Sequence, residues 1–397
     1  MIAQRLADHR AAARRRLPRF LFDYIDGGAY AEQTLAANVS DLAAVALRQR
    51  VMVDVAHIDT SATWFGTTHA LPVALGPIGL AGMYARRGEV QASRAASAAS
   101  VPFCQSTLSL CSLGEVAAAG PPPWFQLYMM KDRGFMRGLI AEARDLGCPA
   151  LVFTVDLPIA GARYRDRRSG LSGAPGLATD LRRYAQAALH PRWALDVGLL
   201  GRPHRLGNVA PVLGAQSGLE DFLAWIGANM DRSVSWADLE WVRDAWPGPL
   251  ILKGVLDVDD ARAARALGAD ALVVSNHGGR QLDGVLSTAR ALPLIADAVG
   301  DDLLLFADGG VRSGLDVLRL LALGAKGVLL GRAWAWALGG AHGGSGEAGV
   351  RHMLGIITAE LQVAMALTGV TSIAEISGDV LVGGAAQAPH PLLSSRA

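Results

Sequence analysis

Residues 275–283, which read SNHGGRQLD, combine several side chains that could do chemistry together. His277 follows an apolar run, precedes two glycines that leave space around its ring, and lies three positions before Arg280. Imidazole titrates near neutral pH and suits a general base, while a guanidinium binds a carboxylate through paired hydrogen bonds. A lone histidine is more often structural than catalytic, but this combination favours an active site for an acid.

Two glycine-rich turns, DGGVR at 308–312 and GR at 331–332, also follow apolar runs. Such turns expose backbone N–H groups at helix starts, where an anion is favoured. Either turn alone is a weak signal, but the pair predicts a phosphate site. Its candidate residues are Asp308, Gly309, Gly310, Arg312, Gly331 and Arg332.

Hydrogen-bonding residues or a sharp turn close four earlier apolar runs. Side chains two positions apart in a strand share a face. A polar residue at one strand end is usually a helix cap, but four consecutive cases favour a polar-lined pocket. The residues are Pro77, Ile78 and Gly79 in the first turn, then Ser106, Gln126 with Tyr128, and Thr154 with Asp156.

Lys253 closes the fifth run, directly after Leu-Ile-Leu. The chain has three lysines beside 34 arginines, so a lysine here indicates that a compact ammonium is needed. A surface lysine is the alternative interpretation, which the apolar residues before it disfavour.

Eight apolar runs must position these residues, with amphipathic stretches such as 257–267 and 314–323 between them. Continuous apolar runs suit strands buried on both faces. Eight strand–helix units predict an α/β fold of the (β/α)8 TIM-barrel type, whereas a doubly wound sheet more often has fewer strands. The runs are 71–76, 101–106, 124–128, 150–156, 249–254, 271–275, 303–308 and 327–331.

Two segments lie outside this repeat. Residues 1–65 are expected to form an N-terminal helical segment, and a long insertion follows the fourth strand. Three regions are predicted: a helical segment at 1–65, the barrel at 66–385 and a tail at 386–397. Helices are expected near 20–25 and 32–47 in the first region. A helical pattern is also present at 216–247, inside the insertion.

Composition excludes several classes of protein. The 37 Lys+Arg and 36 Asp+Glu residues nearly cancel, which argues against a uniformly basic nucleic-acid binder. No segment reads as a membrane span or a signal peptide, and the three cysteines lack CxxC spacing. The mean hydropathy of +0.27 leaves peripheral membrane attachment open.

The basic segment, residues 157–215, breaks this balance. It carries nine arginines and three aspartates, a net charge of +6, so the rest of the chain sums to −5. Arginines interleaved with Trp, Tyr and Leu, as in 181–184 and 191–193, are typical of a segment that meets an anionic bilayer surface. A mobile active-site lid with arginines facing water is the alternative.

A phosphate site, polar strand ends, a lysine and a histidine inside one barrel suggest flavin mononucleotide (FMN) and an acid substrate. No HxH or HExxH pattern indicates a metal, and no GxGxxG follows the first strand. A Schiff-base aldolase acting through Lys253 is the competing enzyme. A non-catalytic sensor of a phosphorylated ligand is a weaker alternative.

The motifs SNHGGRQLD, DGGVR, LLGR, WFQLY and FDYIDGGA resemble those of the FMN-dependent L-2-hydroxy-acid dehydrogenases and oxidases, over about residues 4–385. LPRFLFDYIDGGAY and TVDLPIAGARYRD resemble in particular its bacterial respiratory members that act on L-lactate. The resemblance implies oxidation of L-lactate to pyruvate by bound FMN. Glycolate, lactate or mandelate oxidation by a soluble, O2-using enzyme is the alternative.

The resemblance also implies residue roles. His277 would be the base and Asp156 would orient it; whether a hydride or a carbanion is involved stays open. Arg163 and Arg280 would bind the substrate carboxylate, assisted by Tyr24 and Tyr128. Pro77, Ile78, Gly79, Ser106, Gln126, Thr154 and Lys253 would contact the flavin ring and ribityl chain, and Asp308, Gly309, Gly310, Arg312, Gly331 and Arg332 the phosphate.

For partners, the resemblance implies a quinone as electron acceptor and an anionic membrane surface reached through 177–215. The expected location is the cytoplasmic face of the bacterial inner membrane, with peripheral attachment. A homo-oligomer, usually a tetramer in this family, is expected, and no nucleic acid.

Overall fold

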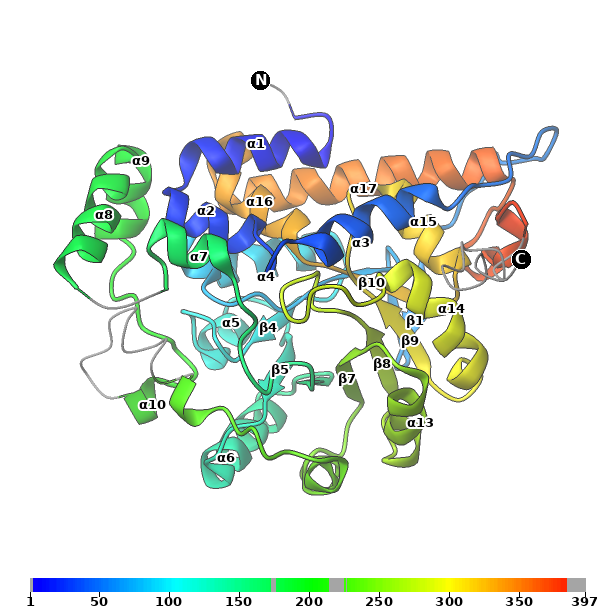
Figure 1. Ribbon diagram of the computed structural model, residues 1–397. Helices are drawn as coiled ribbons and strands as arrows, with labels where there is room; N and C mark the ends of the chain where they lie inside the picture. Colours follow the sequence, from blue (N-terminus) through cyan, green and yellow to red (C-terminus); the bar gives the residue numbers. More distant parts are fainter. Residues whose placement is uncertain (1–2, 173–175, 214–224, 226, 384–397) are drawn as a thin grey trace, which may run out of the picture.

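The structure is a computed structural model that describes residues 3–172, 176–213, 225 and 227–383. Its centre is an eight-stranded parallel sheet (Figure 1). The strands are β3 (Val73–Leu75), β4 (Cys104–Ser106), β5 (Trp124–Tyr128), β6 (Leu151–Thr154), β7 (Leu250–Val255), β8 (Ala271–Val274), β9 (Leu304–Ala307) and β10 (Gly327–Leu330). Each overlaps one of the eight predicted apolar runs, and the ends differ by three residues at most.

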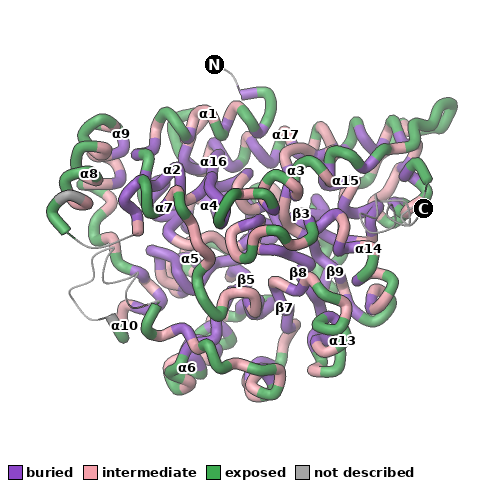
Figure 2. Tube along the Cα trace, in the orientation of Figure 1, coloured by how far each residue is buried: buried purple, intermediate pink, exposed green. Residues whose placement is uncertain are grey.

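The sheet closes into a barrel. Its order is β3-β10-β9-β8-β7-β6-β5-β4, and a parallel bridge between Leu75 and Phe103 joins the two end strands. Every residue of these strands is buried except Gly254 and Leu304, which are half-buried, as Figure 2 shows for the centre of the molecule. Burial on both faces explains the continuous apolar runs, and the prediction of a (β/α)8 barrel is confirmed.

Helices surround the barrel between successive strands. Ser112, Asp132, Asp257 and Ser313 each cap one of them by accepting a backbone N–H of the first turn. The helices are α4 (Gly88–Ala98), α5 (Leu113–Ala118), α6 (Arg133–Asp145), α12 (Glu240–Ala245), α13 (Val258–Ala266), α14 (Thr288–Val299), α15 (Gly314–Ala322), α16 (Arg332–Gly340) and α17 (Gly346–Thr368). Short 3-10 helices cover Ala81–Met83, Trp236–Leu239, His342–Gly344, Ile373–Glu375 and Gly378–Val380.

The N-terminal segment contains α1 (Leu6–Arg16), α2 (Arg19–Asp26) and α3 (Gln33–Ala44), which lie over one end of the barrel with α16 and α17 (Figure 1). The helices predicted near 20–25 and 32–47 are present. A hairpin of β1 (Ala62–Trp64) and β2 (Thr67–His69) was not predicted from the sequence. Its Trp64 packs on Phe306 and Trp124 at the opposite end of the barrel, with ring centroids 4.9 and 6.2 Å away.

The predicted insertion lies between β6 and β7. It contains α7 (Tyr164–Ser169), α8 (Leu177–Ala188), α9 (Pro191–Trp193), a π-helical turn (Ala194–Leu199) and α10 (Ala210–Leu213). Of the helical pattern predicted at 216–247, residues 216–224 and 226 lie outside the described residues, while α12 covers part of the remainder. The predicted tail at 386–397 also lies outside them.

Within the described ranges, one helix, α17, is long and apolar enough to cross a membrane by length and composition. The sequence analysis expected no such segment. α17 packs against α4, α15 and α16, as a helix of the barrel does, and length and composition alone are weak support for a membrane span.

Candidate active site

A cavity of about 830 Å³ opens at the carboxyl ends of the barrel strands. It gathers all but three of the residues predicted for the site. Those lining it are Tyr24, Pro77, Ile78, Gly79, Tyr128, Thr154, Arg163, Lys253, His277, Arg280, Asp308, Gly309, Gly310, Arg312, Gly331 and Arg332. The three others are Asp156, Ser106 and Gln126.

Asp156 lies directly behind His277. Its Oδ1 and Oδ2 are 2.9 and 3.1 Å from Nδ1 of the imidazole. Gly254 makes this approach possible, because its φ is +104° and a Cβ there would lie 2.4 Å from Cγ of Asp156. With Nδ1 held by the carboxylate, Nε2 is the ring nitrogen available to a ligand in the cavity.

The electrostatics of this pair suit a base. Burial lowers the pKa of His277, although the charge and hydrogen bond of Asp156 oppose the shift. Burial alone would raise the pKa of Asp156, but His277 and Lys253 lower it overall. At neutral pH the pair is therefore a neutral imidazole beside an ionised carboxylate, ready to accept one proton.

Lys253 is buried in a polar triangle. Its Nζ lies 2.9 Å from Oδ2 of Asp308 and donates to Oγ of Ser275 at 3.0 Å. The Ser275 hydroxyl donates to Oδ1 of Asp308 at 2.7 Å and accepts the backbone N–H of His277. Although burial opposes it, the carboxylates of Asp308 and Asp156 raise the pKa of Lys253, which keeps a full positive charge. Asp308, predicted at the phosphate, thus has its carboxylate occupied by Lys253.

Two guanidiniums face the cavity from different elements. Arg163 precedes α7 and donates from Nε to the carbonyl of Arg280 at 3.2 Å. Arg280 donates to the carbonyls of Tyr24 and Gly27 at 2.5 and 2.8 Å. Within the described part of the chain, neither forms an ion pair with a carboxylate. Burial and then the charge of Arg280 lower the pKa of Arg163. The carboxylate of a bound ligand would offset both the burial of this guanidinium and its repulsion by Arg280.

Two tyrosines complete this wall. The ring of Tyr24, on α2, lies 4.8 Å from the guanidinium carbon of Arg280, close enough for a cation–π contact. Tyr128, the last residue of β5, is buried, and its burial raises the pKa of its hydroxyl, which stays protonated and can donate. Thr154 pairs in register with Tyr128 and with Lys253 on the adjoining strands.

A further unmatched positive charge lies close to Arg280. Arg332 begins α16 and donates to the carbonyls of Gly278 and Gly27 at 2.9 and 2.8 Å, while its Nε has no partner among the described residues. Burial, then Arg280 and Arg312, hold the pKa of Arg332 well below its usual value. Burial also lowers the pKa of Arg312 to about 10. Such a cluster calls for an anion.

Gly331 leaves space for that anion, while Gly309 and Gly310 let their turn pack closely against Asn38 of α3. A Cβ on Gly331 would meet nothing within 4 Å, so the backbone at the start of α16 faces open space. Gly309 and Gly310 have φ values of +94° and +83°, and a Cβ on Gly310 would lie 2.0 Å from the Asn38 carbonyl oxygen. These features fit a phosphate held by backbone N–H groups, Arg312 and Arg332.

Ser106 and Gln126 are fully buried and do not line the cavity. The Ser106 hydroxyl donates to Oε1 of Gln126 at 3.1 Å, and the Gln126 amide nitrogen has no partner among the described residues. A buried, unpaired amide donor is costly. A ring edge with acceptor atoms would satisfy it, which fits the predicted flavin contact.

Several residues that support the site were not predicted from the sequence. Ser275 bridges Lys253, Asp308 and His277, and the Gln281 amide donates to the carbonyl of Asp156 at 2.8 Å. Both lie in the SNHGGRQLD motif, which could have drawn attention to them. Asp166 also lines the cavity, and its burial raises the pKa of its carboxyl; it ends the TVDLPIAGARYRD motif, which could have drawn attention to it.

A barrel with a histidine–aspartate pair, a buried lysine, unpaired arginines for an acid and a phosphate cradle defines a flavin-dependent oxidoreductase of hydroxy acids. Comparison with known proteins agrees. The family described as FMN-dependent dehydrogenase matches residues 13–383, and the chain belongs to this family. Its cofactor is FMN.

Relatives and solved structures extend the match over nearly the whole chain. The L-lactate dehydrogenase of Caulobacter vibrioides (strain NA1000 / CB15N) is 64% identical over 382 residues, which are 96% of this chain and 98% of that protein. The Alcaligenes faecalis L-lactate dehydrogenase is 59% identical over 383 residues, 96% and 99% of the two chains.

Among solved structures, the monotopic membrane protein (S)-mandelate dehydrogenase superposes with a TM-score of 0.88 at 33% identity, covering 96% of this chain and 100% of that one. A mandelate oxidase superposes with a TM-score of 0.79 at 38% identity, covering 94% and 96%.

Proposed function

We propose that the protein oxidises L-lactate to pyruvate with FMN as the first electron acceptor. One observation carries the proposal: the His277–Asp156 pair shares its cavity with two guanidiniums that have no carboxylate partner among the described residues. A base opposite a carboxylate-binding pair fits a 2-hydroxy acid. The relatives named L-lactate dehydrogenase support lactate as that acid.

The residues around the substrate divide into those that bind it and those that accept its proton. Arg163 and Arg280 bind the substrate carboxylate, and the hydroxyls of Tyr24 and Tyr128 orient the substrate beside them. Nε2 of His277 accepts one proton, from the hydroxyl or from Cα in the two routes that this chemistry allows. Asp156 keeps the proton of His277 on Nδ1 beforehand and stabilises the imidazolium afterwards.

Other residues hold the cofactor. The residues that would hold its phosphate are Arg312, Arg332, Gly309, Gly310 and Gly331. Lys253, kept charged by Asp308, stands where it can stabilise added negative charge. Bound FMN supplies a two-electron acceptor.

The test is anaerobic mixing of the purified holoenzyme with L-lactate, D-lactate, glycolate and L-mandelate, followed by the visible absorbance of the oxidised flavin. We expect L-lactate to bleach the flavin fastest and D-lactate not to bleach it. A protein that none of these acids bleaches would refute the proposal, and fastest bleaching by L-mandelate would refute lactate as the substrate.

The base is tested by His277→Gln, which keeps hydrogen-bonding capacity but cannot accept a proton. We expect the bleaching rate constant to fall by roughly 10²- to 10⁴-fold, with FMN still bound. His57→Gln, at an exposed position outside the cavity, is the control and should bleach at the wild-type rate.

We further propose that electrons leave to a quinone and that the basic segment attaches the protein peripherally to an anionic membrane, at the cytoplasmic face of the bacterial inner membrane. Support comes from the apolar side chains that this segment exposes among its arginines. Relative exposures are 90% for Leu177, 70% for Leu181, 73% for Tyr184, 78% for Leu189 and 61% for Leu199. A neighbouring solved structure is also a monotopic membrane protein.

Vesicle sedimentation tests this attachment. Leu181→Ser with Leu189→Ser should reduce binding to vesicles containing anionic lipid while lactate still bleaches the flavin. Leu294→Ser on α14 removes an exposed leucine elsewhere and should bind as the wild type does. If the double variant still binds the vesicles as the wild type does, the membrane attachment is refuted and the basic segment is better explained as an active-site lid.

The competing chemistries lack this support. A Schiff-base lysine needs an uncharged amine, whereas Asp308 and Asp156 raise the pKa of Lys253. Direct use of O2 would appear as peroxide formed in step with pyruvate. The proposed homo-oligomer is tested by the molar mass of the protein in solution.

A further inference from the structure

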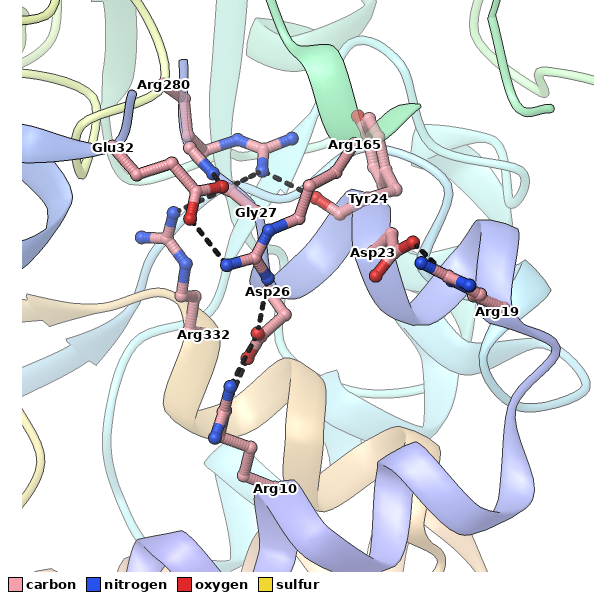
Figure 3. A network of polar contacts seen from close by, with 11 residues as sticks. Arg10, Arg19, Asp23, Tyr24, Asp26, Gly27, Glu32, Arg165, Arg280 and Arg332 are labelled. Carbon is pink, nitrogen blue, oxygen red and sulfur yellow. Dashed lines mark hydrogen bonds and ion pairs between the residues drawn. The ribbon is translucent and has the colours of Figure 1, made fainter. Parts of the chain in front are cut away.

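The carbonyl oxygen of Gly27 lies between two arginines that line the cavity. It accepts a hydrogen bond from Arg280 at 2.8 Å and another from Arg332 at 2.8 Å. Arg280 faces the proposed substrate carboxylate and Arg332 the phosphate. One peptide group at the end of α2 therefore helps to orient both guanidiniums (Figure 3).

A neutral carbonyl orients an arginine without neutralising it. An aspartate at this place would form an ion pair and weaken the attraction of the guanidiniums for substrate and phosphate. A carbonyl has no fixed charge, but it is useful only if its peptide group is held in position. The surroundings of Gly27 must supply that rigidity.

Asp26, the residue before Gly27, contributes to this rigidity. Its side chain is 3% exposed and accepts from Arg10 at 2.5 and 2.7 Å and from Arg165 at 3.0 Å. These two arginines come from α1 and α7, so the carboxylate ties the end of α2 to two other helices. Removing one member of a buried ion pair leaves an uncompensated charge.

Glu32 holds the same peptide group from its other side, because the Gly27 carbonyl and the Gly28 N–H belong to one planar peptide. One carboxylate oxygen accepts the backbone N–H of Gly28 at 2.9 Å, and the other lies 2.5 Å from Nη2 of Arg165. Arg165 thus bridges Asp26 and Glu32, one on each side of Gly27. A Cβ on Gly27 would lie 2.6 Å from the Asp23 carbonyl oxygen and 3.3 Å from Cδ of Arg165, so the backbone packs closely here.

We propose that Asp26, through Arg10 and Arg165, is a positioning residue that sets the Gly27 carbonyl and thereby aligns Arg280 and Arg332 together. The inference rests on the proposed function for the identity of the substrate. It requires substrate affinity and FMN affinity to change together when the clamp of Asp26, Arg10 and Arg165 is broken, because one carbonyl serves both arginines.

The test is Asp26→Asn, which keeps the size of the side chain and removes its charge. We expect KM for the hydroxy acid and the dissociation constant for FMN each to rise, roughly tenfold to a hundredfold for a misplacement of this kind. Once FMN and substrate saturate the enzyme, kcat should change far less, because His277 and Asp156 are untouched. A merely structural role would lower the thermal midpoint and leave both affinities of the folded protein unchanged.

Asp23→Asn is the matched control. Asp23 is a buried carboxylate on the same helix, paired with Arg19 at 3.2 Å, and its side chain has no hydrogen bond or ion pair with Arg10 or Arg165 in the described structure (Figure 3). The KM and the FMN affinity of Asp23→Asn should equal those of the wild type.

If Asp26→Asn does not fold, Asp26→Glu answers the same question, since the longer side chain keeps the charge but displaces the clamp. Both affinities unchanged, or only one of them changed, would overturn the proposal. FMN affinity is measured without any hydroxy acid. It therefore tests the clamp even if the wild type bleaches with none of the acids, a result that would refute the proposed function.

Discussion

His277 and His9 are both buried histidines, but their neighbours differ. His277 has the carboxylate of Asp156 at 2.9 Å and faces a cavity. His9, on α1, is 0% exposed and has two other histidines beside it. Its Nε2 is 3.1 Å from Nδ1 of His352 on α17, and its ring centroid lies 5.8 Å from that of His342.

Burial lowers the pKa of both residues, and the neighbours determine whether the ring can still serve as a base. Asp156 opposes the effect of burial at His277. At His9 the charges of His352 and His342 add to burial and lower the pKa to about 4, while Nδ1 has no partner among the described residues. A buried histidine therefore becomes a usable base only with a carboxylate beside it; without one it is a site of acid sensitivity.

The largest expected effect comes from making His277 resemble His9. Asp156→Asn removes the carboxylate, so the pKa of His277 should fall further and the imidazolium should lose its stabilising charge. We expect the bleaching rate constant with L-lactate to fall by roughly 10²- to 10⁴-fold. It is measured by anaerobic stopped-flow absorbance as a function of pH, and the acidic limb of the profile should move to lower pH.

Asp302→Asn is the control, because Asp302 pairs with Arg265 at an exposed position. It should leave both the rate constant and the pH profile unchanged. A wild-type rate constant in Asp156→Asn would mean that the carboxylate contributes nothing to the base, and the comparison with His9 would fail.

The barrel was predictable because its signal is local. Burial on both faces forces each strand into a continuous apolar run, and eight runs identify the fold without knowledge of long-range contacts. The hairpin of β1 and β2 has no such signal. It is held by Trp64 packing on Phe306, and a threonine-rich stretch with one buried tryptophan does not differ locally from a loop.

The site was predictable where a motif carries it. His277, Arg280 and Lys253 could be read from strand ends, since a barrel brings those ends together. Asp156 was expected beside His277 from the family resemblance, but most other partners of these residues could not be predicted. Gly27 contributes a backbone carbonyl that any residue would have, and the cluster of His9, His342 and His352 joins positions up to 343 apart in the chain.

A smaller effect is expected on stability. Since the pKa of His9 falls from 6.5 unfolded to about 4 folded, the unfolded chain binds the proton more readily between these values. Stability should therefore be lost as pH falls below about 6.5, up to about 3 kcal/mol by pH 4. His9→Leu should flatten this loss, which is measured as the thermal midpoint of the holoenzyme against pH.

The exposed His57 provides the reference for that experiment. His57→Gln should retain the full wild-type dependence on pH, because it leaves His9, His342 and His352 unchanged. An equally steep loss of stability in His9→Leu would place the acid sensitivity elsewhere in the molecule.

The smallest effect should come from a neighbour of His9. His342→Asn removes one of the two charges that lower the pKa of His9 but leaves burial and His352 in place. The pKa of His9 should then rise by a fraction of a unit. The loss of stability in acid should therefore shrink by only about 0.5 kcal/mol. The same midpoint measurement detects it. If the thermal midpoint of His342→Asn depended on pH as little as that of His9→Leu, repulsion within the cluster, and not burial, would be the main cause of the lowered pKa of His9.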